Sequence, residues 1–146
     1  MEKKRVVITG LGALTPIGNN VSDYWSNLIK GVSGADYITR FDASLFKTQF
    51  ACEVKGFDPE SIMHRKEARK LDLFSIFAMA TAKEAMEDSN IDLENINLDR
   101  AGVIWGSGIG GLKTFQEECF NFKDGDGSPR FNPFFIPKMI VDIAAG

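Results

Sequence analysis

The chain has few of the residues from which disulfide frameworks, metal sites and histidine-based catalysis are built. Its 146 residues include two cysteines and one histidine. Cys52 and Cys119 provide neither a disulfide framework nor a metal-ligand spacing. With His64 as its sole histidine, the chain cannot supply a histidine pair. No metal site is therefore expected, and the cysteine content favours a reducing cytoplasm.

Long hydrophobic runs and an excess of positive charge are also absent. No apolar stretch approaches the ~20 residues that span a bilayer, and the N-terminus carries no signal-peptide pattern. The net charge of -3 provides no overall positive field to attract nucleic acid. Hydrophobic residues make up 44% and charged residues 25%, as in ordinary globular proteins. We expect a cytoplasmic protein that acts neither on a membrane nor on nucleic acid.

Residues 101–111 hold a short apolar run followed by a glycine-rich turn. The run ends at Ile104 and Trp105, which predicts a buried strand, and a helical pattern begins at Leu112. The glycines between them are Gly106, Gly108, Gly110 and Gly111. Glycines permit positive φ and close backbone approach. The turn could therefore present backbone N–H groups to a ligand, or it could allow two elements to pack closely.

Residues 106–111 also satisfy the dinucleotide-binding pattern G-x-G-x-x-G. A dinucleotide-binding unit requires a second strand that ends in an acidic residue about 20 residues further on. At that distance, residues 126–132 form a loop containing Gly and Pro. Close packing is therefore the favoured interpretation, and a nucleotide-dependent oxidoreductase is the less favoured alternative.

Strand and helix patterns alternate along the chain. Residues 5–9 are β-branched and predict a first strand, and residues 50–54 alternate as in a half-buried strand. Helices are predicted over residues 21–30, 59–62 and 71–89. This order indicates an α/β fold with a mixed, mostly parallel sheet between helices. Only two core strands are evident, so we expect the sheet to be incomplete.

A basic cluster precedes the longest predicted helix. Arg65, Lys66, Arg69 and Lys70 have the spacing that places them on one face of a helix, interrupted by Glu67. A positive patch on an acidic chain suits an acidic macromolecule or a phosphate group. The alternative is a solvated helix face on which Glu67 pairs internally, and the residues alone favour this alternative.

No residue has the sequence surroundings of an activated nucleophile. Cys119 follows two glutamates, whose negative charge opposes thiolate formation. Cys52 is expected to be a small buried hydrophobe, and His64 is expected to have a structural or surface role. Asp124 and Asp126 resemble half of a calcium loop that lacks its final glutamate. The residues alone therefore predict no complete catalytic set.

Five motifs, in order, resemble the β-ketoacyl-acyl carrier protein synthases, and most closely the synthase II group of bacterial type II fatty acid synthesis. They are RVVITGLGALTPIGN at 5–19, SG at 33–34 with FD at 41–42, RKEARKLD at 65–72, GSGIGG at 106–111 and NPFFIP at 132–137. The resemblance covers essentially the whole chain. It implies a thiolase-type fold, in which each of two α/β halves has a five-stranded mixed sheet between helices.

The resemblance also implies a decarboxylative condensation. A cysteine thiolate accepts an acyl chain from acyl carrier protein, and two histidines assist the decarboxylation of malonyl-acyl carrier protein. The resulting carbanion attacks the thioester, and backbone N–H groups stabilise the oxyanion. No redox cofactor or obligatory metal is implied, and a homodimer is the expected assembly.

The resemblance assigns recognition roles to particular residues. The residues that match the helix docking the acidic carrier protein are Arg65, Lys66, Arg69 and Lys70. This match reverses the interpretation of the basic cluster. The residues that match the acyl-chain pocket are Gly108 with Ile109, and Phe134 with Phe135 near its far end and the dimer interface.

No catalytic residue can be assigned, because Cys52, Cys119 and His64 all lie away from the catalytic positions of the family. We therefore expect residues 1–146 to be the N-terminal portion of a ketosynthase domain, truncated before the catalytic cysteine and inactive alone. An alternative within the same fold is a non-catalytic, chain-length-determining partner subunit. A cysteine at the next strand-to-helix turn would distinguish the enzyme from that partner.

Overall fold

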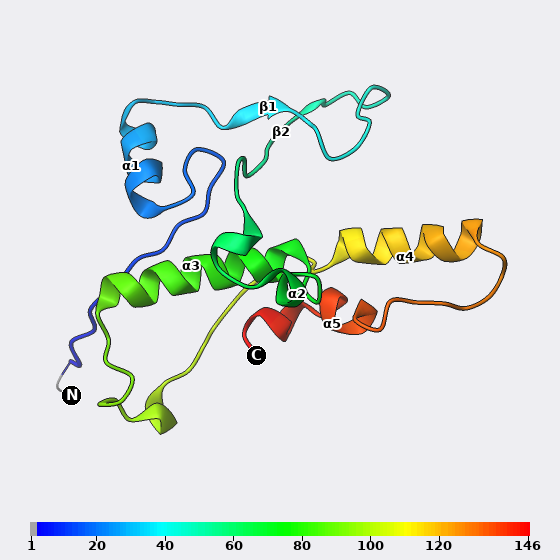
Figure 1. Ribbon diagram of the computed structural model, residues 1–146. Helices are drawn as coiled ribbons and strands as arrows, with labels where there is room; N and C mark the ends of the chain where they lie inside the picture. Colours follow the sequence, from blue (N-terminus) through cyan, green and yellow to red (C-terminus); the bar gives the residue numbers. More distant parts are fainter. Residues whose placement is uncertain (1–2) are drawn as a thin grey trace. The chain divides into compact units, whose positions relative to one another are not determined.

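The computed structural model describes residues 3–146, which divide into two compact units. The first unit contains the chain up to Phe57 together with Ala80–Ile91, and the second contains Asp58–Met79 and Asp92–Gly146. Helix α3, Leu73–Ser89, contributes residues to both units (Figure 1). No helix within residues 3–146 has the length and apolar content that crossing a bilayer requires.

In the first unit, helix α1 (Val21–Ile29) begins and ends as its capping residues predict. The Asn20 side chain accepts a hydrogen bond from the Asp23 N–H at 2.8 Å and so caps the first turn. Gly31 has a φ of +69°, the left-handed conformation in which glycine commonly ends a helix. The prediction for this helix is confirmed.

Two short strands, β1 (Ala35–Tyr37) and β2 (Phe50–Cys52), form an antiparallel pair in which Asp36 lies opposite Ala51. The strand β2 was predicted. Its apolar residues Phe50 and Cys52 were expected to be buried and Ala51 exposed, but the structure shows the reverse. Phe50 is 63% exposed and Cys52 is exposed, whereas Ala51 is half-buried. Cys52 is therefore not a buried hydrophobe, because no described element covers its face of the hairpin.

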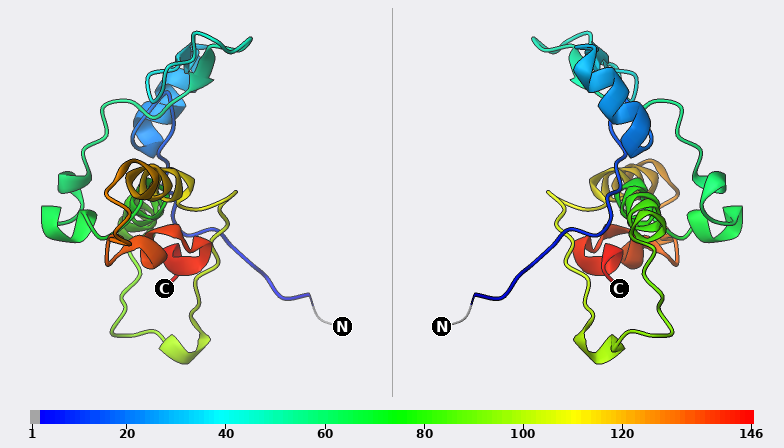
Figure 2. Two further views of the ribbon diagram at one scale, coloured as in Figure 1. Left: turned by 90° about the vertical axis from the view of Figure 1, so that its right-hand side faces the viewer. Right: turned by 90° about the vertical axis from the view of Figure 1, so that its left-hand side faces the viewer.

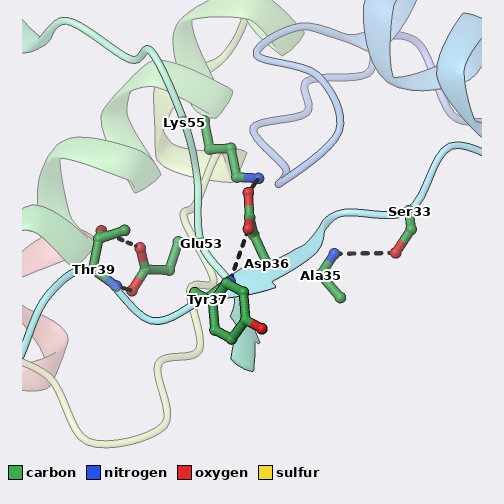
Figure 3. A network of polar contacts seen from close by, with 7 residues as sticks. All are labelled: Ser33, Ala35, Asp36, Tyr37, Thr39, Glu53 and Lys55. Atoms are coloured by element: carbon green, nitrogen blue, oxygen red, sulfur yellow. Dashed lines mark hydrogen bonds and ion pairs between the residues drawn. The ribbon is translucent and has the colours of Figure 1, made fainter. Parts of the chain in front are cut away.

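Polar contacts hold the hairpin and the segments beside it (Figure 3). The Lys55 ammonium donates to Asp36 at 2.8 Å, and this bond, with a second from the Tyr37 N–H, lowers the pKa of the Asp36 carboxyl. The Thr39 hydroxyl donates to Glu53 at 2.6 Å and lowers the pKa of Glu53. The first unit therefore depends on surface hydrogen bonds where it lacks an apolar core.

The predicted parallel sheet is not present within residues 3–146. The segments 5–9 and 101–105 form no strand, and the one sheet of the described chain is the β1–β2 pair. Their apolar side chains are exposed, with Val6 at 90%, Ile8 at 84% and Ile104 at 100%. A strand requires a neighbour to accept and donate its ladder hydrogen bonds, and neither segment has one. The structure therefore differs from the sequence prediction at these two places.

The loop between residues 10 and 20 is fixed to the C-terminal half of α3. The Glu84 carboxylate accepts hydrogen bonds from the Ala13 and Val21 N–H groups, both at 2.8 Å. Asp88 accepts from the Leu11 N–H at 2.9 Å. The loop also approaches the helix closely, because a Cβ on Gly12 would lie 1.9 Å from the Thr81 carbonyl oxygen. Two carboxylates of α3 thus satisfy two N–H groups of this loop and the first N–H group of α1.

The second unit is mainly helical. Its elements are the 3₁₀ turn η1 (Pro59–Ser61), α2 (Arg65–Ala68), the start of α3, η2 (Leu98–Arg100), α4 (Leu112–Asp124), α5 (Phe135–Met139) and η3 (Val141–Ala144). Helices α4 and α5 pack side by side (Figures 1 and 2). Asp58 caps η1 as predicted, although η1 is a single 3₁₀ turn.

Helix α3 ends as predicted at Ser89, before Asn90 with its positive φ of 50°. Its burial is less extensive than its apolar sequence indicates. The buried residues of the helix are Ser75, Ile76 and Ala78, all in its first half. Met79 and Met86 remain 47% and 41% exposed. The apolar pattern therefore predicted the helix itself but not the extent of its burial.

We predict that Glu84→Ala lowers the free energy of unfolding by about 1–3 kcal/mol, because it leaves two backbone N–H groups without their acceptor. Urea unfolding would measure this loss, and the Ala13 and Val21 amides would exchange hydrogen faster. Glu87→Ala is the matched control, since Glu87 is exposed and its distance to Lys83 is 4.0 Å. We expect the control to change stability by less than about 1 kcal/mol. Equal losses for the two variants would contradict the assigned role of Glu84.

Candidate functional site

The predicted docking residues lie in a basic segment, Arg65–Lys70, of the second unit. Helix α2 covers only Arg65–Ala68, and Arg69 is its C-cap. The Lys70 N–H donates to the Glu67 carbonyl at 2.9 Å, which continues the chain as a turn. The segment is therefore one helical turn that ends in a hydrogen-bonded turn, and the Arg69 N–H donates to the Arg65 carbonyl at 3.2 Å.

His64 has a structural role at the start of this segment. Its Nδ1 accepts a hydrogen bond from the Lys66 N–H at 3.1 Å and caps α2. The expectation of a structural or surface role for His64 is confirmed.

The four basic side chains of the segment differ in their pairing. The Lys70 ammonium contacts both carboxylate oxygens of Glu67, at 2.9 and 3.0 Å. The Arg65 Nε lies 3.7 Å from Glu60. Lys66 and Arg69 form no ion pair with any residue between 3 and 146. The segment therefore presents two paired and two unpaired cations.

Lys70 also contacts the segment that contains the predicted pocket residues. Its ammonium lies 6.0 Å from the centroid of the Phe134 ring, at the edge of cation–π range. The neighbouring Phe135 ring has other contacts, and it stacks between Phe115 at 6.2 Å and Phe131 at 5.9 Å. The structure thus brings Phe134 to the basic segment, whereas Phe135 joins α5 to α4.

The glycine turn packs against the end of α5. The Gly111 N–H donates to the Met139 carbonyl at 3.3 Å, and Gly110 has a φ of +84°. A Cβ built on Gly111 would lie 2.1 Å from the Lys138 carbonyl oxygen, so only glycine fits this position. These contacts confirm the close-packing interpretation for the second half of the turn.

The first half of the turn is open. A Cβ at Gly108 would meet no atom within 4 Å, and Ile109 is 69% exposed. Ile109 therefore projects from a turn whose following residues are fixed by packing. An exposed apolar side chain on a fixed backbone can contact an apolar ligand or another segment of the protein.

A side-chain hydrogen bond connects the basic segment with α4. The Thr114 hydroxyl donates to the Asp72 carboxylate, and Thr114 is only 8% exposed. Asp72 follows Lys70 by two residues, and Thr114 lies in the first turn of α4, directly after the glycine turn. Sequence reasoning missed this pair, because 42 residues separate its members and Thr114 lies outside every motif.

No group of three or more potential metal ligands occurs in the part of the chain that the structure describes. A polar pocket of about 390 Å³ lies in the first unit, with Asn19, Asp23, Asn27 and Lys55 among its lining residues. It contains none of the predicted site residues. The residues that the sequence singled out thus belong to the second unit.

Comparison with known proteins identifies the family of this chain. A family model described as "Beta-ketoacyl synthase, N-terminal domain" matches residues 3–146. The 3-oxoacyl-acyl-carrier-protein synthase 2 of Coxiella burnetii is 49% identical over 146 residues, which cover 100% of this chain and 35% of that protein. The protein of the same name from Synechocystis sp. is 46% identical with the same coverage. The chain therefore spans about a third of the length of these relatives.

Solved structures share its fold. The ishigamide ketosynthase/chain length factor has a TM-score of 0.77 and 25% identity, covering 94% of this chain and 34% of that one. A beta-ketoacyl synthase from Burkholderia phymatum has a TM-score of 0.76 and 24% identity, covering 98% and 35%. The chain thus has the fold of a portion of these proteins.

We predict that Gly111→Ala lowers the free energy of unfolding by about 1–3 kcal/mol, because its Cβ would overlap the Lys138 carbonyl. Gly108→Ala is the matched control, since open space surrounds that position. We expect the control to change stability by about 0.5 kcal/mol or less. Thermal unfolding of both variants measures the difference, and equally stable variants would contradict the packing role of Gly111.

Proposed function

The chain belongs to the β-ketoacyl synthase family, and from this membership we propose that the protein is a 3-oxoacyl-acyl-carrier-protein synthase of fatty acid biosynthesis. It condenses malonyl-acyl carrier protein with an acyl chain held as a thioester on the enzyme. The observation that carries the proposal is identity of 46–49% to synthases of this name over the whole chain. These names favour the enzyme over a non-catalytic partner subunit.

The covalent chemistry belongs to residues outside this chain. A cysteine thiolate takes up the acyl group, decarboxylation of the malonyl group releases CO₂ and a carbanion, and the carbanion displaces the thiolate. Cys119 lies on α4 and Cys52 on β2, and both are exposed. The described residues supply recognition and positioning instead.

The basic segment is proposed as the docking surface for the acidic carrier protein. Its exposed cations suit acidic side chains, and Lys66 and Arg69 are available without breaking an ion pair in the described chain. Gly108, Ile109 and Phe134 form the proposed wall of the acyl pocket, with Phe135 supporting it from the stack on α4. The contact between Lys70 and Phe134 supports a docking surface adjacent to the pocket wall.

The finer fold is also part of the proposal. The exposed apolar segments 5–9 and 101–105 become strands of a mixed, mostly parallel thiolase-type sheet when other strands pair with them. The protein is proposed to be a homodimer in the cytoplasm, in keeping with its low cysteine content. The packed second half of the glycine turn gives no support to a nucleotide-dependent oxidoreductase.

We predict that the protein at its full natural length converts malonyl- and acyl-loaded carrier protein into β-ketoacyl carrier protein and CO₂. Mass spectrometry of the loaded carrier follows the product. Residues 1–146 alone are expected to be inactive, because they lack an activated nucleophile. Condensation by the 146-residue chain would contradict the placement of the nucleophile outside it, and absence of product from the full-length protein would refute the proposed function.

We predict that the double variant Arg65→Glu with Lys66→Glu weakens carrier binding about tenfold or more, through lost attraction and new repulsion. The remaining affinity would depend less on salt, since fewer opposite charges meet. Lys83→Glu with Lys113→Glu is the control, because it changes the net charge equally on α3 and α4. Titration calorimetry measures both, and the docking assignment is wrong if the two double variants bind the carrier equally well.

A further inference from the structure

Within the basic segment, the chain itself supplies an anion to one of the cations. The Glu67 carboxylate receives two contacts from the Lys70 ammonium, at 2.9 and 3.0 Å. The two residues are three apart, and the hydrogen bond between their backbones keeps them one turn apart. Their side chains are 60% and 42% exposed, so both lie within reach of a partner.

Glu67 already uses part of the capacity of Lys70 to bind a carboxylate. An ammonium group has three N–H donors, and the bifurcated contact with Glu67 takes up part of this capacity. The centroid of the Phe134 ring lies 6.0 Å from the same ammonium. A partner carboxylate that reaches Lys70 therefore meets an ammonium whose charge and N–H donors Glu67 already uses in part.

We propose that Glu67 competes with the acidic carrier protein for Lys70, so that docking exchanges one carboxylate for another. This inference rests on the proposed function, which supplies the acidic partner. Lys66 and Arg69 receive the partner first, because they have no ion pair to break within the described residues. The competition weakens the docked complex and speeds its dissociation, which suits a carrier that must leave after each delivery.

The test is a double-mutant cycle in the full-length protein, with purified acyl carrier protein as the probe. Exposed ion pairs of this kind change an equilibrium by roughly 1.4- to 5-fold. Glu67→Gln is therefore expected to tighten carrier binding about two- to fivefold, mainly through slower dissociation. In a Lys70→Met background, the same substitution is expected to give less than half of that gain.

Two matched variants separate competition from the simple loss of a negative charge. Glu67→Asp keeps the charge but shortens the side chain by one methylene, so it should slow dissociation without changing the association rate. Glu60→Gln removes an equal charge from the longer pair with Arg65 and should give a smaller gain than Glu67→Gln. Surface plasmon resonance resolves both rates.

The outcomes test the competition of Glu67 for Lys70 separately from the docking surface on which it rests. Equal gains from Glu67→Gln in the native and Lys70→Met backgrounds would overturn the competition, even if the docking surface stands. If Lys66→Glu leaves carrier affinity unchanged, the docking assignment fails and the competition fails with it. A gain that depends on Lys70, together with weakened binding by Lys66→Glu, supports both.

Discussion

Close approach of glycine backbone to a helix is the constraint on which both units depend. In the first unit, Gly12 leaves no room for a Cβ against the Thr81 carbonyl of α3. In the second, Gly111 lies as closely against the Lys138 carbonyl of α5. Any side chain at these positions would push the loop away from its helix. The hydrogen bonds that Glu84 and Met139 accept from the loops form only at this separation.

Local elements could be predicted because their signals lie within a few residues. Asn20 and Gly31 bound α1, and Asn90 ends α3, each through backbone or capping contacts with near neighbours. Contacts between distant segments could not be predicted in this way. The bonds of Glu84 span 63 and 71 residues, and the Asp72–Thr114 bond spans 42. The sequence pattern of these residues is that of ordinary surface positions.

The strands predicted at residues 5–9 and 101–105 are missing for a different physical reason. An apolar, β-branched pattern indicates that a segment is suited to a sheet. The backbone hydrogen bonds of a sheet form only when another strand lies beside the segment. Ile104 has the composition of a core position and is fully exposed. Since this chain spans 35% of the length of its curated relatives, the pattern is explained if the pairing strands come from elsewhere in the protein. The same argument accounts for the sparse burial along α3.

The positive charge that the basic segment presents to a partner depends on which of its cations are already paired, and not only on how many cations it contains. Lys70 and Arg65 already have carboxylates from Glu67 and Glu60, so the exposed potential comes chiefly from Lys66 and Arg69. A partner that binds first to the free cations, and then displaces the intrachain carboxylates, gains less at each later step. The part-buried Asp72–Thr114 bond joins the residues next to this surface to α4, and it involves none of the four cations. If the proposed function holds, weak docking at such a site suits the repeated delivery of a tethered substrate.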